Sequence, residues 1–499
     1  MTGEKSTISD PRKQPNGKAI SGGFWTVVER VIAQISQLVI FIVAARLLGP
    51  AEFGVFALVS AAAILLLRVA EFGWAQYIMA WPGDTAVPRQ VLTIAILFGF
   101  GLSVLSGMFG LSLPFFGVPQ VFSDLVLFFS LWVFLATISS VQKGILIWQD
   151  RLKASAASES IGELAGLFVA LITLFGGFGV LSLAFGRLAF QTVHLFISFS
   201  ASRLPPTLRL TGLDLHELFT FCGQLFAWRM VLNLRIYLAT FLIGGFLGPA
   251  AVGYFRAADR LVGAVGEVIS TPTQVLSWRL FRNARDDHNG TLDGFQQCAN
   301  PFFKVLVIVS APVFIWIVIT GPELVSIILG QEWLPVIPII GVLALSRAIA
   351  MPVVATEAIL SLAGQIKRLI PLSILHLVVS LLLNYFAAQF GLYTVAWTQV
   401  LISLVVLITT MQLQQKFGAI RALETAGGSI GLIIPILIGS AALLLTRQAA
   451  VAMQLSDLMT IIVPTMISAV IFLCALLITQ PAWRKFIWAG FRQKLRFPR

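Results

Sequence analysis

Long apolar segments, separated by short polar or Gly-Pro breaks, run through almost the whole chain. A helix that spans a membrane needs about 20 consecutive apolar residues. The segments that meet this length lie at 21–47, 53–80, 90–113, 120–147, 158–176, 179–200, 216–247, 252–281, 299–320, 334–362, 368–389, 392–414, 428–446 and 458–479. No connection between them is long enough for a soluble domain. The pattern therefore predicts an all-α polytopic membrane protein with about 14 transmembrane helices.

A ten-residue stretch occurs twice, at 47–56 (LLGPAEFGVF) and at 246–255 (FLGPAAVGYF), and each copy links two apolar segments. The Gly-Pro pair is expected to end one helix, and the later glycine to let the next helix restart tightly. Both copies follow an odd-numbered helix. The repeat therefore predicts two parallel six-helix halves, related by an axis along the membrane normal, with helices 13 and 14 as additions.

The repeat and the apolar segments together predict a division into domains. We expect a cytoplasmic tail, a six-helix bundle, a cytoplasmic linker, a second six-helix bundle, two additional helices and a basic amphipathic tail on the membrane surface. Their bounds are 1–20, 21–200, 201–215, 216–414, 428–479 and 480–499.

Composition supports membrane insertion. The chain is 58% hydrophobic and 11% charged, with a mean hydropathy of +0.92. Its net charge of +12 gathers in the tails and in the loops that would face the cytoplasm if both termini do. This bias is the positive-inside asymmetry of membrane proteins, and it explains the basic balance without a nucleic-acid partner. No removable signal peptide is expected, and the first helix stays as an anchor.

Ionisable residues inside the predicted helices are the candidate functional groups, because such residues are costly in a membrane and face a cavity or a partner. The first and seventh helices contribute repeat-equivalent pairs, since Arg30 aligns with Arg229 and Gln34 with Asn233. The full set of candidates is Glu29, Arg30, Gln34, Arg68, Glu71, Arg229, Asn233, Arg256, Asp259, Arg260 and Glu267.

Two interpretations of these residues remain open. In the first, Glu29, Glu71, Asp259 and Glu267 are internal partners of neighbouring arginines, or sites for a coupling ion. In the second, the helices line a central cleft in which basic residues outnumber acidic ones, which suits an anion. The planar fork of arginine suits phosphate oxygens in particular. On this interpretation Arg30, Gln34, Arg68, Arg229, Asn233, Arg256 and Arg260 bind the substrate.

The absence of certain sequence motifs argues against some classes of protein, such as P-loop ATPases and zinc proteins. The sequence has no G-x-x-x-x-G-K-[ST] motif for ATP hydrolysis and no His or Cys group with zinc spacing. The three cysteines, Cys222, Cys298 and Cys474, lie far apart and suggest packing rather than disulfides. We therefore expect a transporter driven by an existing gradient, with no cofactor, no metal and no catalytic residue.

The segment 45–58, entered from a helix that begins Ser-Gly-Gly-Phe-Trp at 21–25, resembles the N-terminus of Wzx-type polysaccharide flippases. These belong to the multidrug/oligosaccharidyl-lipid/polysaccharide exporter superfamily. The stretch 247–261 (LGPAAVGYFRAADRL) is similar to the region of their seventh and eighth helices.

The resemblance implies a V-shaped pair of bundles that works by alternating access in the bacterial inner membrane. It also implies a substrate of oligosaccharide repeat units on undecaprenyl diphosphate, held in a cationic central cavity. Arg30, Arg256 and Arg260 are the nearest positions to the arginines of that cavity in relatives. A polymerase or chain-length complex is a possible partner, and the expected oligomeric state is a monomer.

A second hypothesis is a cation-coupled exporter of drugs or other amphiphiles from the same superfamily. An exporter of cations would favour acidic residues in its cleft, whereas this set leans basic, so the first hypothesis is preferred. A membrane-embedded glycan polymerase or ligase would need catalytic groups outside the membrane, and the sequence offers none.

Overall fold

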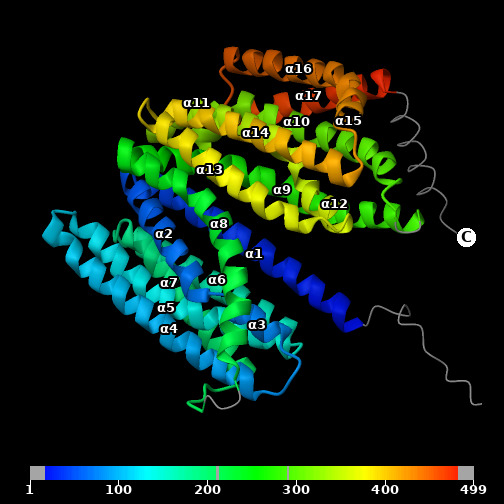
Figure 1. Cartoon of the computed structure of the whole chain (residues 1–499). Coiled ribbons are helices and arrows are strands. Elements are labelled where there is room, and N and C mark those ends of the chain that lie inside the picture. The colour runs from blue at the N-terminus through cyan, green and yellow to red at the C-terminus, as the bar shows by residue number, and fades with distance from the viewer. Residues whose placement is uncertain (1–16, 210–212, 289–290, 481–499) are drawn as a thin grey trace, which may run out of the picture. The chain divides into compact units, whose positions relative to one another are not determined.

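The computed structural model describes residues 17–209, 213–288 and 291–480, and within these ranges its regular elements are helices joined by short loops, without a strand (Figure 1). The described part forms two compact units. The first contains the chain up to Ala44 together with Leu66–Ala227, and the second contains Ala45–Leu65 together with the chain from Trp228 on. Both predicted tails fall mainly outside the described residues.

Helices of the first unit come from the N-terminal part of the chain. They are α1 (Gly17–Leu47) up to Ala44, the end of α2 (Pro50–Glu71) from Leu66 on, α3 (Trp74–Ala80), α4 (Ala86–Ser112), η1 (Leu113–Phe116), α5 (Gln120–Trp148), α6 (Leu152–Phe175) and α7 (Leu181–Ser202), and α8 (Leu215–Leu247) begins there. Helices α4 to α7 pack side by side, as Figure 1 shows. Gly166 and Gly186 allow the closest approach, because a Cβ on either residue would lie within 3 Å of the other's carbonyl oxygen.

The second unit contains the start of α2, the end of α8 and all later helices. These are α9 (Pro249–Asp287), α10 (Phe295–Ile328), η2 (Gln331–Val336), α11 (Ile337–Ala350), η3 (Met351–Ala355), α12 (Thr356–Leu362), η4 (Ile366–Arg368), α13 (Leu369–Ala388), α14 (Leu392–Gly418), α15 (Ala422–Ser429), η5 (Ile430–Leu432), α16 (Ile433–Ala452) and α17 (Asp457–Thr479). Helix α14 packs against α11 and α13, and α16 and α17 pack against each other and against α10.

The all-α polytopic fold is confirmed. Within the described ranges, twelve helices are long and apolar enough to cross a membrane, or thirteen if the two bent parts of α8 form one span. The remaining predicted span, at 252–281, is the long helix α9, whose polar stripe keeps it outside this group. The predicted division into domains remains a prediction.

Two predicted spans are interrupted. The segment 53–80 breaks between α2 and α3, where Phe72 and Gly73 both have positive φ, of 41° and 108°. A side chain on Gly73 would also approach the backbone of Cys222 to 3.3 Å, so the break needs a residue without Cβ. The segment 334–362 is divided into α11, η3 and α12, with Pro352 at the start of η3.

Both copies of the repeat start a helix with proline, which tolerates the first helical position because no backbone partner is lost there. Pro50 begins α2, and Pro249 begins α9 directly after Gly248, whose φ is 82°. The expectation that the later glycine eases the restart was wrong. Gly54 and Gly253 lie inside these helices, where each allows a close contact with the backbone at the start of the other helix.

Candidate functional site

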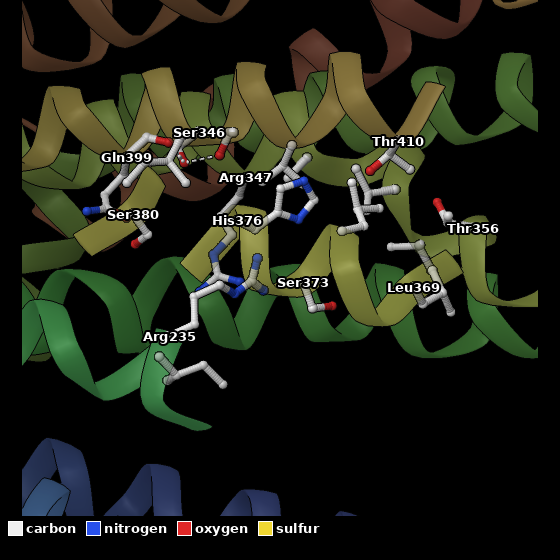
Figure 2. Close-up of a pocket in the computed structure, with 18 of the residues that line it drawn as sticks. Arg235, Ser346, Arg347, Thr356, Leu369, Ser373, His376, Ser380, Gln399 and Thr410 are labelled. Atoms are coloured by element: carbon white, nitrogen blue, oxygen red, sulfur yellow. Dashed lines mark hydrogen bonds between the residues drawn. The ribbon is translucent and has the colours of Figure 1, made fainter. Parts of the chain in front are cut away.

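A cavity of about 890 Å³ lies within the second unit (Figure 2). Helices α8, α9, α11, α13 and α14 line it, together with η3, α12 and η4. Four of these helices are long and apolar enough to be membrane spans or parts of one: α8, α11, α13 and α14. The cavity is therefore a polar space among membrane-spanning helices, where charged side chains need a function or a partner.

The lining of this cavity carries more positive than negative groups. Its cationic side chains are Arg235, Arg256, Arg347 and Lys367, and its carboxylates are Asp259 and Glu357. Two positive charges are left in excess when each carboxylate balances one cation. Such an excess favours an anionic ligand, because low-dielectric walls strengthen its attraction to the lining.

Asp259 holds two of the arginines. Its Oδ1 lies 2.8 Å from Arg347 Nη2, and its Oδ2 lies 3.6 Å from Arg256 Nη1. The Arg256 guanidinium also stacks over the ring of Tyr237, 5.3 Å from its centroid. One carboxylate thus orients two guanidinium groups from α9 and α11, and it can neutralise only one of them.

Arg235 adds a third guanidinium to the same space. Figure 2 shows Arg235 and Arg347 reaching the same part of the cavity, beside His376. Arg235 and Arg347 repel each other, and Arg235 also acts electrostatically on the ring of His376. Like charges held this close favour a shared anion, since an anion between them removes the repulsion.

Hydroxyl and amide groups form another part of the cavity wall. Ser346 Oγ donates to the carbonyl oxygen of Gln399 at 3.0 Å and lies 2.7 Å from Ser403 Oγ (Figure 2). Gln399 Nε2 donates to Asn384 Oδ1 at 2.7 Å. Thr410 Oγ1 is buried and has no hydrogen-bond partner in the described ranges. Such groups can exchange hydrogen bonds with sugar hydroxyls.

A separate charged cluster lies within the first unit. Lys143 of α5 forms an ion pair with Glu159 of α6 and lies 3.7 Å from Glu29 Oε1 of α1. One turn further along α6, Glu163 Oε1 accepts a hydrogen bond of 3.2 Å from Gln37 Nε2. Carboxylates therefore dominate this cluster, whereas arginines dominate the cavity.

The structure places the predicted site residues in different surroundings. Arg68 pairs with Glu71 at 2.6 Å on the same helix. Arg256 and Asp259 pair as well, and both line the cavity. Glu29 pairs with a lysine, since its Oε1 lies 3.7 Å from Lys143 Nζ.

For the other predicted site residues, a role in substrate binding or ion coupling remains a prediction. Arg30 and Gln34 are exposed on α1. On α8, Asn233 Nδ2 donates to the carbonyl oxygen of Arg229 at 2.7 Å. Arg260 and Glu267 lie on α9 outside the cavity lining, and each has interactions of its own.

Several residues of both sites were not among the predicted site residues. Arg235 and Arg347 belong to apolar segments, where an arginine by itself signals a functional position. Glu159 and Glu163 stand four residues apart in an apolar helix, a spacing that places them on one face. Lys143 lies inside α5, within the predicted span 120–147, near the end expected to face the cytoplasm, where a basic residue fits the positive-inside pattern as well as a functional site.

Known proteins resemble this chain in sequence and in fold. A family described as polysaccharide biosynthesis protein matches residues 43–338. The teichuronic acid biosynthesis protein TuaB of Bacillus subtilis is 21% identical over 397 residues, covering 77% of this chain and 80% of that protein. The succinoglycan biosynthesis transport protein ExoT of Rhizobium meliloti is 21% identical over 333 residues, covering 66% of each chain.

Among solved structures, the lipid II flippase MurJ in an inward closed conformation has a TM-score of 0.70. The match covers 94% of this chain and all of that one at 12% identity, so it shows a shared fold. The family match spans more than half of the chain and includes the repeat turns, α8, α9 and the start of α11. The chain is therefore a multi-pass membrane protein that belongs to the polysaccharide biosynthesis protein family.

Proposed function

We propose that this protein is a flippase that moves undecaprenyl-diphosphate-linked oligosaccharide repeat units across the bacterial inner membrane for surface or exopolysaccharide biosynthesis. The single observation that carries the proposal is the cationic excess of the cavity among membrane-spanning helices. A diphosphate carries the opposite charge, and arginine binds its oxygens through paired hydrogen bonds.

Different side chains of the cavity recognise the diphosphate and the sugars of the substrate. Arg235, Arg256 and Arg347 bind the diphosphate, with Asp259 holding two of them in place. The hydroxyl and amide groups near Ser346 and Gln399 contact the first sugars. Arg30, Gln34, Arg68, Arg229, Asn233 and Arg260 remain further candidates for substrate contacts during the transport cycle.

The orientation of the protein in the membrane is inferred from the distribution of basic residues in the sequence. Both termini face the cytoplasm, since the basic residues gather in the tails and the loops on that side. A polysaccharide polymerase is a partner in this setting, and the protein works as a monomer. The alternative, an exporter of cationic drugs, would place surplus carboxylates in the cavity, and the lining has the opposite sign.

The direct test is transport by purified protein in vesicles. We would reconstitute the protein in lipid vesicles with undecaprenyl diphosphate that carries a fluorescent oligosaccharide. The fraction of this fluorescence that a membrane-impermeant quencher removes from the outer face of the vesicles measures transport. Hydrogen bonds to charged groups contribute about 1.5–3 kcal/mol each. Arg235→Gln and Arg347→Gln should therefore lower affinity by roughly tenfold or more.

Arg421→Gln is the matched control, because Arg421 is exposed and pairs with Glu424 away from the cavity. It should transport at the rate of the parent protein. Export of cationic dyes by the parent, with no movement of the lipid-linked sugar, would support the exporter instead.

A further inference from the structure

The charged cluster of the first unit, which we call the Lys143 cluster, consists of Glu29, Lys143, Glu159 and His194. Its members come from α1, α5, α6 and α7. Lys143 Nζ pairs with Glu159 Oε1 and lies 3.7 Å from Glu29 Oε1. The side chains of Glu29 and Glu159 are only 16% and 18% exposed, so water screens them little.

The cluster has two carboxyl groups for one ammonium group. Both carboxyl groups lie against the same ammonium group, so the cluster has one surplus negative charge when both are ionised. An unbalanced carboxylate is costly inside a membrane. The arrangement therefore favours one bound proton, held by Glu29 or Glu159.

Other charged groups nearby do not remove the need for this proton. Glu163 is attracted by Arg187 of α7 and accepts a hydrogen bond from Gln37, so it has partners of its own. Arg30, next to Glu29 on α1, is exposed. Lys143 pairs with Glu159 and lies close to Glu29, so one ammonium group faces two carboxyl groups, and release of a bound proton would leave one carboxylate uncompensated in the membrane at a high energetic cost.

His194 supplies a second observation, independent of the carboxyl groups. Its side chain is buried, with 4% of the residue exposed, and neither ring nitrogen has a hydrogen-bond partner in the described ranges. The ring stacks on Phe190 at 5.7 Å and is within electrostatic reach of Glu159 and Lys143. A neutral imidazole beside a carboxyl pair can relay a proton, because one ring nitrogen can take up a proton while the other releases one.

The ligand of this cluster is a proton rather than a metal ion. The ammonium group of Lys143 lies between the carboxyl groups, where a cation such as sodium would otherwise bind. No group of three or more His, Cys, Asp or Glu side chains in the described ranges is arranged to hold a metal ion. A proton needs only one carboxyl oxygen and fits beside the lysine.

We propose that the Lys143 cluster is the proton-binding site that couples a proton gradient to transport. The proton binds at a carboxyl oxygen of Glu29 or Glu159, and His194 accepts it on its way in or out. Loss of the proton leaves the cluster with a net negative charge, which favours a conformation in which the cluster is hydrated. This inference rests on the proposed transport function and adds its driving ion.

The test uses the same vesicles, with the full-length protein and an imposed pH gradient or sodium gradient. The parent protein should transport the lipid-linked sugar faster with a pH gradient, and a sodium gradient alone should have no effect. In Glu29→Gln and Glu159→Gln, the rate with the pH gradient should fall to the rate without it, while binding of inorganic pyrophosphate to the protein stays unchanged.

Asp124→Asn is the matched control, since Asp124 lies on α5 but bonds to Gln120 at the opposite end of that helix from Lys143. It should keep the response to the pH gradient. If Glu29→Gln and Glu159→Gln keep it as well, or if sodium drives the parent, the inference fails and the flippase proposal stands. If the parent moves no lipid-linked sugar at all, the proposed function fails.

A spectroscopic measurement on the parent protein tests the inference even if one of the variants does not insert into the membrane. Infrared difference spectra of the parent protein between neutral and alkaline pH should show loss of the C=O band of a protonated carboxyl group. The band should be absent from whichever of Glu29→Gln and Glu159→Gln can be purified, and present in Asp124→Asn. A parent protein without such a band would overturn the inference.

Discussion

Gly54 of α2 and Gly253 of α9 each lie against the backbone of the other's helix start. A Cβ on Gly54 would overlap the carbonyl oxygen of Pro249, and a Cβ on Gly253 would overlap that of Pro50. The two glycines occupy equivalent positions of the repeat, and so do the two prolines. The two copies of the turn therefore contact each other reciprocally within the second unit.

Neighbouring contacts anchor the first copy of the turn to the second unit. Trp333 Nε1 donates to the carbonyl oxygen of Ala45 at 2.8 Å, and its ring packs edge-on against Phe53 and Tyr254. Arg46 donates to carbonyl oxygens at the C-terminal end of α10, including that of Ile328 at 3.2 Å. A basic side chain is favourable there, because the last carbonyl groups of a helix lack partners.

Alanine at either glycine should destabilise the protein. The clash is with backbone atoms, which cannot rotate away, so we expect a loss of about 1–3 kcal/mol for Gly54→Ala or Gly253→Ala. Gly245→Ala is the control, since a Cβ there has no neighbour within 4 Å. Thermal unfolding in detergent should show a lower midpoint for the first two variants only. Equal midpoints for all three would mean that the contact is loose.

The sequence was sufficient for the class of fold and for the end of the helix before each repeat turn. Apolar length predicts membrane helices directly, because the bilayer sets that length. The Gly-Pro pairs marked the ends of α1 and α8 correctly, whereas α2 and α9 begin at the prolines, before the predicted spans 53–80 and 252–281. The break at Phe72 was not predictable from apolar length, because it depends on a close approach to Cys222, far along the chain.

The candidate sites were only partly predictable for a similar reason. Arg256 and Asp259 lie three apart on one helix, so their pairing follows from spacing. Arg347 joins them from α11, and Glu29 joins Lys143 from α1 to α5, through contacts between distant helices. Single-sequence periodicity identifies the face of a helix but not the helix that packs against it.

Asp259→Asn should strengthen anion binding in the cavity. The substitution keeps the shape of the side chain and removes the negative charge that holds Arg347 and Arg256. We expect roughly tenfold tighter binding of inorganic pyrophosphate, a gain of about 1.4 kcal/mol. Calorimetric titration of the solubilised protein measures it, with Glu424→Gln as a control on an exposed pair. Unchanged or weaker binding would mean that Asp259 does not compete with the ligand.

Gly73→Ala should destabilise the first unit. Gly73 has a φ of 108°, which costs an L-residue about 1–2 kcal/mol. The added Cβ would also approach Cys222 Cα to 3.3 Å. Gly177→Ala separates the two effects, because Gly177 has a φ of 79° and no neighbour within 4 Å of its Cβ position. The midpoint of thermal unfolding should be lower for Gly73→Ala than for Gly177→Ala. The reverse order would contradict the argument that the contact with Cys222 adds to the cost.

The ion pair between Glu323 of α10 and Arg447 of α16 should anchor the two C-terminal membrane helices. Arg447 Nη2 lies 2.8 Å from Glu323 Oε1, and the two side chains are 22% and 8% exposed. Removing one partner of a buried pair leaves an uncompensated charge and costs about 3–5 kcal/mol. We therefore expect Glu323→Gln to lower the unfolding midpoint and to increase proteolysis between α15 and α17.

The double variant Glu323→Gln, Arg447→Gln should recover much of this loss, because no charge is then left without its partner. The exposed pair of Arg421 and Glu424, whose side chains are 73% and 52% exposed, provides the comparison. Breaking that pair should cost about 1 kcal/mol or less. A double-mutant cycle on each pair measures its coupling energy. A coupling energy for Glu323 and Arg447 as small as that of the exposed pair would show that this ion pair does not anchor α16.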